Sequence, residues 1–236
     1  MITTVLFDLD CTLLPMDQDR FVQVYLKCMA ANLAPHGYDP ELFTKTIQKC
    51  TGAMVMNDGK HRNDVIFWQV FESVFGKDAR KDEPLFEEYY HTDFQRMTDH
   101  CGFDPRAAQA VREIKAMGYR VALATNPFFP AIATHSRVRW AGLTPEDFEL
   151  ITTYENSYHC KPNLDYYRDV LASLNVNAEE CVMVGNDVSE DMIAEELGMQ
   201  VFLLTDCMIN KHSKDISRYP RGSFPELMAF IRGLNK

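Results

Sequence analysis

The feature that most constrains the fold is an alternation of strand-like and helix-like patterns over residues 104–236. Short runs of β-branched and apolar residues alternate with longer stretches in which apolar residues recur at helical spacing. The predicted strands cover residues 120–124, 149–152, 181–184 and 200–204, and the predicted helices cover residues 105–117, 130–140, 164–174, 189–197 and 224–234. Alternation with short loops is typical of a parallel sheet with helices on its faces. We therefore predict an α/β fold with a doubly wound parallel sheet.

A helical block interrupts this pattern near its start. Residues 3–7 predict a further strand, because β-branched and apolar residues occur there together without alternation. Residues between this strand and residue 104 follow helical spacing and give no strand signal. A single strand is not stable alone, so the first strand must belong to the later sheet. We predict a core domain from residues 1–13 and 104–236, and an inserted α-helical cap domain from residues 14–103.

Polar residues stand at or near the ends of the predicted strands, or at the start of the following helix. They are Asp8 and Asp10, Thr125 and Asn126, Lys161, and Asn186, Asp187 and Asp191. In an open α/β sheet, ligands bind outside the carboxyl ends of the strands. We therefore expect these side chains to converge on one crevice.

The residue types in this crevice indicate phosphoryl chemistry. Two carboxylates 4 Å apart repel by about 4 kcal/mol at an effective dielectric near 20, and a hard cation such as Mg²⁺ relieves that repulsion. A lysine, a hydroxyl and backbone N–H groups suit a phosphoryl group. One carboxylate can attack phosphorus, while a neighbouring acid protonates the leaving oxygen.

Four motifs resemble those of the haloacid dehalogenase-like hydrolase superfamily. They are FDLDCTL at residues 7–13, Thr125-Asn126, Lys161-Pro162, and Gly185-Asn186-Asp187 followed by Asp191. The resemblance implies a Rossmann-like core, a helical cap and a magnesium-dependent phosphatase. Such an enzyme would hydrolyse a small-molecule phosphate monoester through an aspartyl-phosphate intermediate.

The resemblance also implies a role for each acid of the site. Asp8 would be the nucleophile and a ligand of Mg²⁺. Asp10 would be the general acid and base, with its backbone carbonyl on the metal and a raised pKa. Asp187 would complete the metal site.

The remaining motif residues would act on the phosphoryl group or support the site. Thr125 and Asn126 would bind the transferring group, and Lys161 would neutralise its charge. Asp191 would orient Lys161 or a metal-bound water, and Asn186 could also reach such a water.

Two positions depart from the family pattern. The residue after the second aspartate is often Gly, whereas Cys11 stands here, in the loop that leads into the cap. We do not expect Cys11 to be a nucleophile, because the adjacent acids should raise the pKa of its thiol. The fourth motif reads Gly-Asn-Asp instead of Gly-Asp, and the spacing to Asp191 favours Asp187 over Asn186 as the metal ligand.

Charge and hydropathy exclude several classes of partner. The chain carries 24 Lys and Arg against 34 Asp and Glu, a formal net charge of −10, so we expect no binding to nucleic acid or to an anionic membrane surface. No apolar run approaches a membrane span, and the N-terminal residues do not look like a signal peptide. The seven cysteines include no C-x-x-C pair. We expect a cytoplasmic protein; its oligomeric state is not indicated.

Other functions remain open at this point. A phosphomutase or another phosphoryl-transfer enzyme of the same fold would share the motifs. A non-catalytic phospho-acceptor or binding domain, such as a receiver, would also place acids, Thr and Lys around Mg²⁺, but on a chain about half as long. A basic turn at residues 57–62 of the cap either contacts the substrate or is a solvated loop, and the second reading is favoured.

Overall fold

The computed structural model describes residues 1–234. Its centre is one sheet in the order β2-β1-β3-β4-β5, and every neighbouring pair is parallel. The strands are β1 (Thr4–Phe7), β2 (Arg120–Leu123), β3 (Cys181–Gly185), β4 (Gln200–Leu204) and β5 (Arg221–Gly222). The α/β prediction is therefore confirmed. β1 pairs with both β2 and β3, which explains how a strand so far from the others in sequence is stable.

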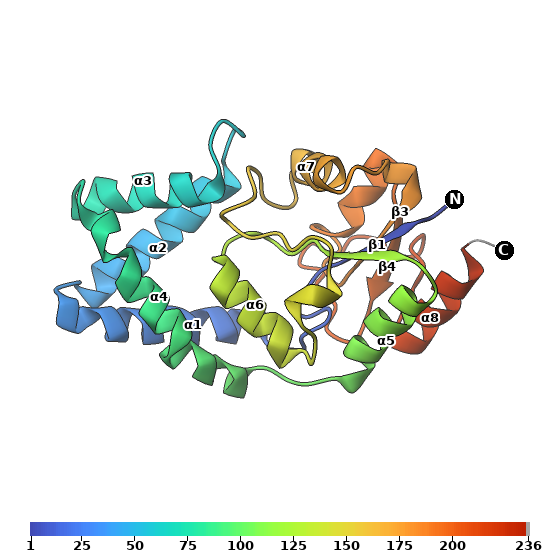
Figure 1. The fold of residues 1–236 in the computed structure, drawn as a ribbon, viewed down its shortest axis with the longest axis horizontal. Coiled ribbons are helices and arrows are strands. Elements are labelled where there is room, and N and C mark those ends of the chain that lie inside the picture. Colours follow the sequence, from blue (N-terminus) through green and yellow to red (C-terminus); the bar gives the residue numbers. More distant parts are fainter. Residues whose placement is uncertain (235–236) are drawn as a thin grey trace.

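The α-helices divide into two groups (Figure 1). They are α1 (Gln18–Leu33), α2 (Pro40–Val55), α3 (Asn63–Phe75), α4 (Glu83–His91), α5 (Pro105–Ala116), α6 (Ala131–Trp140), α7 (Leu164–Leu174) and α8 (Phe224–Gly233). The first four, all inserted between β1 and β2, lie together at one end of the molecule. The last four surround the sheet or stand between it and the inserted helices.

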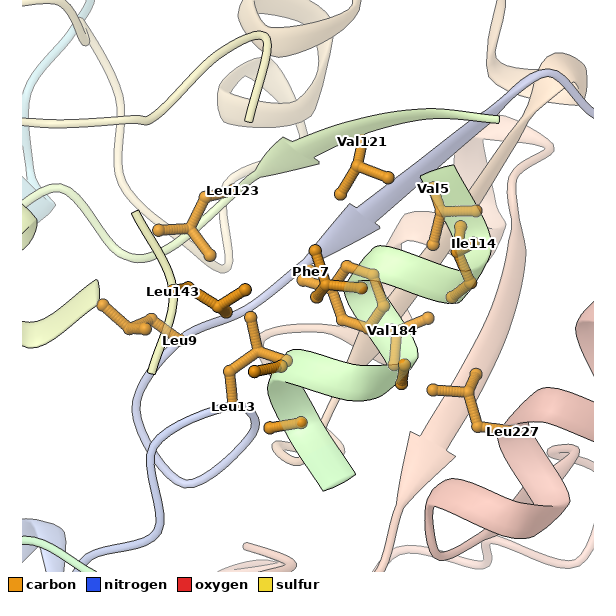
Figure 2. Close-up of a cluster of buried hydrophobic side chains, with 14 of the residues drawn as sticks. Val5, Phe7, Leu9, Leu13, Ile114, Val121, Leu123, Leu143, Val184 and Leu227 are labelled. Carbon is orange, nitrogen blue, oxygen red and sulfur yellow. The ribbon is translucent and has the colours of Figure 1, made fainter. Parts of the chain in front are cut away.

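Both faces of the sheet are covered. Val5 and Phe7 of β1 point into a buried cluster together with Ile114 of α5 and Leu227 of α8, as Figure 2 shows. Leu6, which alternates with them, belongs to the cluster on the other face, beside residues of α7. Burying each of these large side chains contributes roughly 1.5–3 kcal/mol. A strand that is apolar on both faces is the expected result of this two-sided burial.

The inserted helices are joined to the α/β part by packing as well as by the chain. Their buried cluster includes Ala133 of α6, and Tyr154 and Cys160 from the loop before α7. The two chain crossings also pair with each other, since the Gly102 N–H donates to the Pro15 carbonyl at 2.6 Å. Residues 1–234 include no helix with the length and apolarity of a membrane span.

Two predicted elements are wrong. Residues 149–152 run beside β2, where the Leu123 N–H donates to the Leu150 carbonyl at 2.8 Å, but only Ile151 forms a bridge and no strand results. Residues 189–197 are not an α-helix: turns precede a 3-10 helix at Met192–Leu197. Asp187 Oδ1 accepts the N–H groups of Ser189 and Glu190, as a helix N-cap does, but the chain continues in turns and in the tighter 3-10 form.

Candidate active site

The predicted polar residues meet at a single cavity with a volume of about 390 Å³. It lies at the carboxyl ends of the central strands, where a ligand of a doubly wound sheet is expected. Its lining includes Asp8, Asp10, Thr125, Asn126, Asn186, Asp187 and Asp191. Lys161 is only 2% exposed and reaches the cavity through its contact with Asp8.

Asp8 is held from two sides. Its Oδ1 accepts a hydrogen bond from Lys161 Nζ at 3.0 Å, and its Oδ2 lies 3.0 Å from the Thr12 hydroxyl. The backbone N–H of Asp8 continues the pairing of β1 with β3 by donating to the Val184 carbonyl at 2.9 Å. These contacts hold the Asp8 side chain in one orientation at the carboxyl end of β1.

Lys161 bridges two acids. Besides Asp8, its Nζ donates to Asp191 Oδ1 at 2.6 Å. Burial by itself would lower the pKa of Lys161, but the negative charges of Asp191 and Asp8 together outweigh burial and raise that pKa. Asp191 sits directly against Gly185, where an added Cβ would overlap its carboxylate. Only glycine therefore lets Asp191 approach the lysine.

Asn186 and Asp187 are neighbours with different surroundings. The Asn186 amide is buried. Its Oδ1 lies 2.9 Å from the Thr12 hydroxyl, whose one proton is shared between Asn186 and Asp8, and its Nδ2 donates to the Cys207 carbonyl at 3.0 Å. Asp187 lines the cavity and is oriented by the Ser189 and Glu190 N–H groups on Oδ1. The carboxylate is thus better placed than the amide to bind a ligand.

Asp10 forms a buried ion pair with a residue that belongs to none of the four motifs. Its Oδ2 accepts from Arg137 Nη1 of α6, and the Arg137 side chain is 1% exposed. Burial raises the pKa of Asp10, the Arg137 charge opposes that rise, and the Asp8 charge adds to it. The net direction is upward, so Asp10 keeps its proton to a higher pH than an exposed aspartate does.

Thr125 and Asn126, the two residues of the second motif, form another wall of the cavity. The Thr125 carbonyl accepts from the hydroxyls of Thr152 at 2.7 Å and Tyr166 at 2.8 Å. Asn126 Nδ2 donates to Glu190 Oε2 at 2.9 Å, whereas Asn126 Oδ1 is buried without a hydrogen-bond partner. Burial raises the pKa of Glu190.

Cys11 adopts the conformation that explains why glycine is common at its position. Its φ is 63°, in the left-handed region, and its Sγ lies 3.3 Å from the Met16 carbonyl. Burial raises the pKa of its thiol to about 12, and the Asp10 charge adds to that rise. The thiolate form needed for nucleophilic attack is therefore disfavoured, as the sequence predicted.

Several cavity residues were not anticipated. Gln18, Asp19, Val22 and Gln23 of α1 and Ile209 and Lys211 after β4 line the cavity as well. They stand in regions without motifs, so nothing in the sequence singled them out. The basic turn at residues 57–62 lies elsewhere: Gly59 packs against the ring of His159.

The oxygen donors at the cavity fit a hard cation. Asp8 and Asp187 both line it, and the Asp10 carbonyl belongs to the same loop as Asp8. Within residues 1–234, no three His, Cys, Asp or Glu side chains are grouped so as to hold a metal by themselves. Two carboxylates and a carbonyl leave positions for water and substrate, as Mg²⁺ prefers.

Comparisons with known proteins agree with this architecture. The family model of the haloacid dehalogenase-like hydrolases matches residues 2–195. A glyceraldehyde 3-phosphate phosphatase of Methanocaldococcus jannaschii is 27% identical over the full length of both chains. A ribulose-1,5-bisphosphate 5-phosphatase of Halopiger xanaduensis is 26% identical over 86% of this chain and 84% of its own. The crystal structure of a 2-haloacid dehalogenase from Pseudomonas syringae shares the fold, with a TM-score of 0.62, 22% identity and coverage of 98% and 99%.

Proposed function

We infer the function of this chain from its family and its cavity, because the chain belongs to the haloacid dehalogenase-like hydrolases. We propose that it is a magnesium-dependent phosphatase that hydrolyses a small-molecule phosphate monoester. Both curated relatives compared above carry the name of a phosphatase. The observation that carries the proposal is the placement of Asp8, held by Lys161 and Thr12, beside Asp10 in one cavity.

The chemistry divides into two displacements at phosphorus. In the first, a carboxylate oxygen of Asp8 bonds to phosphorus as the bond to the ester oxygen breaks, and Asp10 gives its proton to the departing oxygen. In the second, water attacks the aspartyl-phosphate, Asp10 takes a proton from that water, and inorganic phosphate leaves. Lys161, already paired with Asp8 at 3.0 Å, would offset the charge that gathers on the phosphoryl oxygens.

Other residues would bind and orient the phosphoryl group. Thr125 and Asn126 line the cavity wall, and Asn126 is fixed by Glu190. Asp191 holds Lys161 at 2.6 Å, so its role would be to orient the lysine. Asn186 would support Thr12, which contacts Asp8.

Asp8, Asp187 and the Asp10 carbonyl would hold Mg²⁺. When bound, the ion would offset the repulsion between the carboxylates and the phosphate dianion. The fit rests on the hard oxygen donors that line the same cavity.

The substrate class follows from the cavity and from the relatives. A volume of about 390 Å³ is at the small end of the range for ligand sites. The wall supplied by α1 presents two glutamines and an aspartate, which can hydrogen-bond hydroxyl groups. Both named relatives act on phosphorylated sugars. We therefore propose a small phosphorylated carbohydrate as the substrate.

A phosphate-release screen tests the proposal. Wild-type protein with Mg²⁺ should release inorganic phosphate from one or more members of a panel of triose, pentose and hexose phosphates, nucleotides and phosphoglycolate. Asp8→Asn should lose both turnover and the acid-stable, hydroxylamine-sensitive phosphoenzyme. Wild-type activity in Asp8→Asn would refute the assignment. Movement of the phosphate to another position of the sugar in place of release would identify a mutase, and transfer to a second sugar another phosphoryl-transfer enzyme. Chloride release from a 2-haloacid would identify a dehalogenase.

A further inference from the structure

Arg137 is a buried arginine that no family motif contains. It lies on α6, on the side of that helix that also buries Ala133, Thr134 and Val138. Its side chain is 1% exposed, and Nη1 pairs with Asp10 Oδ2. Because burying a charged group is costly unless that group is paired, the position of Arg137 depends on Asp10 as much as Asp10 depends on Arg137.

The guanidinium is itself held in place. Its Cζ lies 4.2 Å from the centre of the Phe129 ring, and Nη2 donates to the Thr134 hydroxyl at 3.3 Å. Stacking on an aromatic face fixes the plane of the guanidinium, while the hydrogen bonds fix its rotation. The Arg137 guanidinium is therefore held in one position beside Asp10.

Arg137 provides the polar contact that restrains the Asp10 carboxyl. The other oxygen, Oδ1, is buried without a hydrogen-bond partner in the part of the chain that the structure describes. Asp8 differs, since Lys161 and Thr12 contact its two oxygens. Loss of Arg137 would thus leave the orientation of Asp10 to packing alone.

We propose that Arg137 is a positioning residue, which fixes the Asp10 carboxyl in the orientation needed for proton transfer at the leaving-group oxygen. This inference rests on the proposed function. Arg137 does not itself transfer a proton, because its guanidinium has donors only and stays charged. With 1% of its side chain exposed, it acts on the substrate through Asp10.

The test compares two kinds of substrate. Arg137→Met keeps the length of the side chain and its contact with Phe129 but removes the donors. On an alkyl phosphate, whose poor leaving group needs protonation, kcat/KM should fall by about 10²-fold. On an aryl phosphate with a good leaving group, it should fall by less than about fivefold. Arg137→Lys should recover part of the loss, because it restores the charge without the planar fork.

A double-mutant cycle separates positioning from a structural role. In an Asp10→Asn background no acid remains to be positioned, so Arg137→Met should cost less than about threefold further. Arg139→Met, an exposed position on the same helix, is the matched control and should change neither substrate. Unfolding midpoints of all variants show which of them fold; if Arg137→Met does not, Arg137→Lys carries the same substrate comparison.

The outcomes distinguish the two proposals. Equal losses on alkyl and aryl phosphates, or losses that simply multiply in the double mutant, would overturn the positioning role while phosphatase activity stands. If wild-type protein hydrolyses neither phosphate in the presence of Mg²⁺, the proposed function fails, and the role of Arg137 in it fails as well.

Discussion

Asp8 and Asp10 are two positions apart, yet their surroundings suit them to different tasks. Asp8 accepts a hydrogen bond from Lys161 on one oxygen, and the Thr12 hydroxyl lies beside the other, so both oxygens are held in place. Asp10 is pushed toward its protonated form, since burial raises its pKa more than Arg137 lowers it. The two acids thus differ in their polar contacts, as the different roles of a nucleophile and a proton donor require.

This difference predicts how a neutral side chain at position 10 behaves. Asp10→Asn removes the transferable proton but can still accept from Arg137, so folding should persist. We expect kcat/KM for alkyl phosphates to fall by about 10²–10⁴-fold, and the loss for aryl phosphates to be smaller because they need less protonation. Steady-state assays on a series of leaving groups measure the difference, provided that phosphorylation of Asp8 limits the rate. A loss independent of the leaving group would exclude Asp10 as the acid.

At the residue scale, the sequence predicted the motif residues and the pairing of Asp191 with Lys161, but not the partner of Asp10. Asp8, Lys161 and Asp191 were found because each follows a recognisable pattern. One feature of the sequence points to Arg137: it is a charged residue on a buried helix face whose other residues are small or apolar. That signal does not say which acid it meets, because 127 residues separate Arg137 from Asp10. Long-range pairing of this kind depends on the relative placement of α6 and β1.

At the scale of elements, the prediction was best where burial dominates and worst where polar side chains redirect the backbone. The four longer strands lie within one residue of their predicted bounds, because strands buried on both faces leave an unambiguous apolar run. Residues 189–197 look helical by spacing, yet after Asp187 caps Ser189 and Glu190 the chain runs in turns and a 3-10 helix. At residues 149–152 the Asn156 amide donates to the Ile151 carbonyl, and only Ile151 forms a bridge to β2.

The ends of β1 and β3 should behave as one metal site. Treatment with EDTA is expected to abolish phosphate release, and added Mg²⁺ to restore it, because without a cation the carboxylates of Asp8 and Asp187 repel the phosphate dianion. Asp187→Asn should raise the Mg²⁺ concentration for half-maximal activity by at least about tenfold. Glu88→Gln, an exposed position on α4, serves as the control. Full activity in EDTA would exclude the metal from the reaction.

Helix α5 provides a test of stability in acid. Asp104 caps its N-terminus through the Arg106 N–H at 2.9 Å, and the hydrogen bond from the Arg106 side chain lowers the pKa of Asp104. Asp104→Ala should lower the free energy of unfolding by about 1 kcal/mol at pH 7. A lowered folded-state pKa stabilises the protein above the unfolded value near 3.9, and that stability is lost as pH falls through the folded value.

Urea titrations at several pH values measure this effect. The difference between wild type and Asp104→Ala should shrink from pH 7 toward pH 3. Arg106→Met keeps the capping side chain while removing the cause of the lowered pKa, so the pH dependence should weaken in that variant. A difference that stays constant down to pH 3 would contradict the ion-pair explanation.

At the scale of the whole molecule, the inserted helices are seated on the α/β part. The Asn63 N–H donates to the Ser157 carbonyl at 2.8 Å, and the Asp64 N–H donates to the Tyr154 carbonyl at 2.9 Å. These contacts fix the start of α3 on the loop that leads to Lys161. We predict that residues 14–103 move as a cap over the cavity; any such motion must break these contacts as well as bend the crossings at Pro15 and Gly102.

The contact between Gly59 and His159 allows this seating to be probed. A Cβ at Gly59 would lie 2.5 Å from His159 Nε2, and the residue has a φ of +79°. Gly37 is also in the left-handed region, with a φ of +95° and a ψ of 7°, but an added Cβ there would meet no atom within 4 Å. Gly37→Ala should therefore cost only the backbone strain of about 1–2 kcal/mol. Gly59→Ala should cost that strain plus about 1–3 kcal/mol for the clash.

Removing the ring should remove the clash. In a His159→Ala background, the cost of Gly59→Ala in urea unfolding should fall to that of Gly37→Ala, with His159→Ala alone as the reference for its lost bond to Asp169. Because residue 159 lies two positions before Lys161, Gly59→Ala should also lower kcat, and the double variant should recover part of the loss. If Gly59→Ala and Gly37→Ala cost the same in the wild-type background, the turn at residues 57–62 does not pack on the core in solution. The inserted helices would then be attached through the two crossings, the packing against α6, and the contacts of Asn63 and Asp64 with the loop before α7.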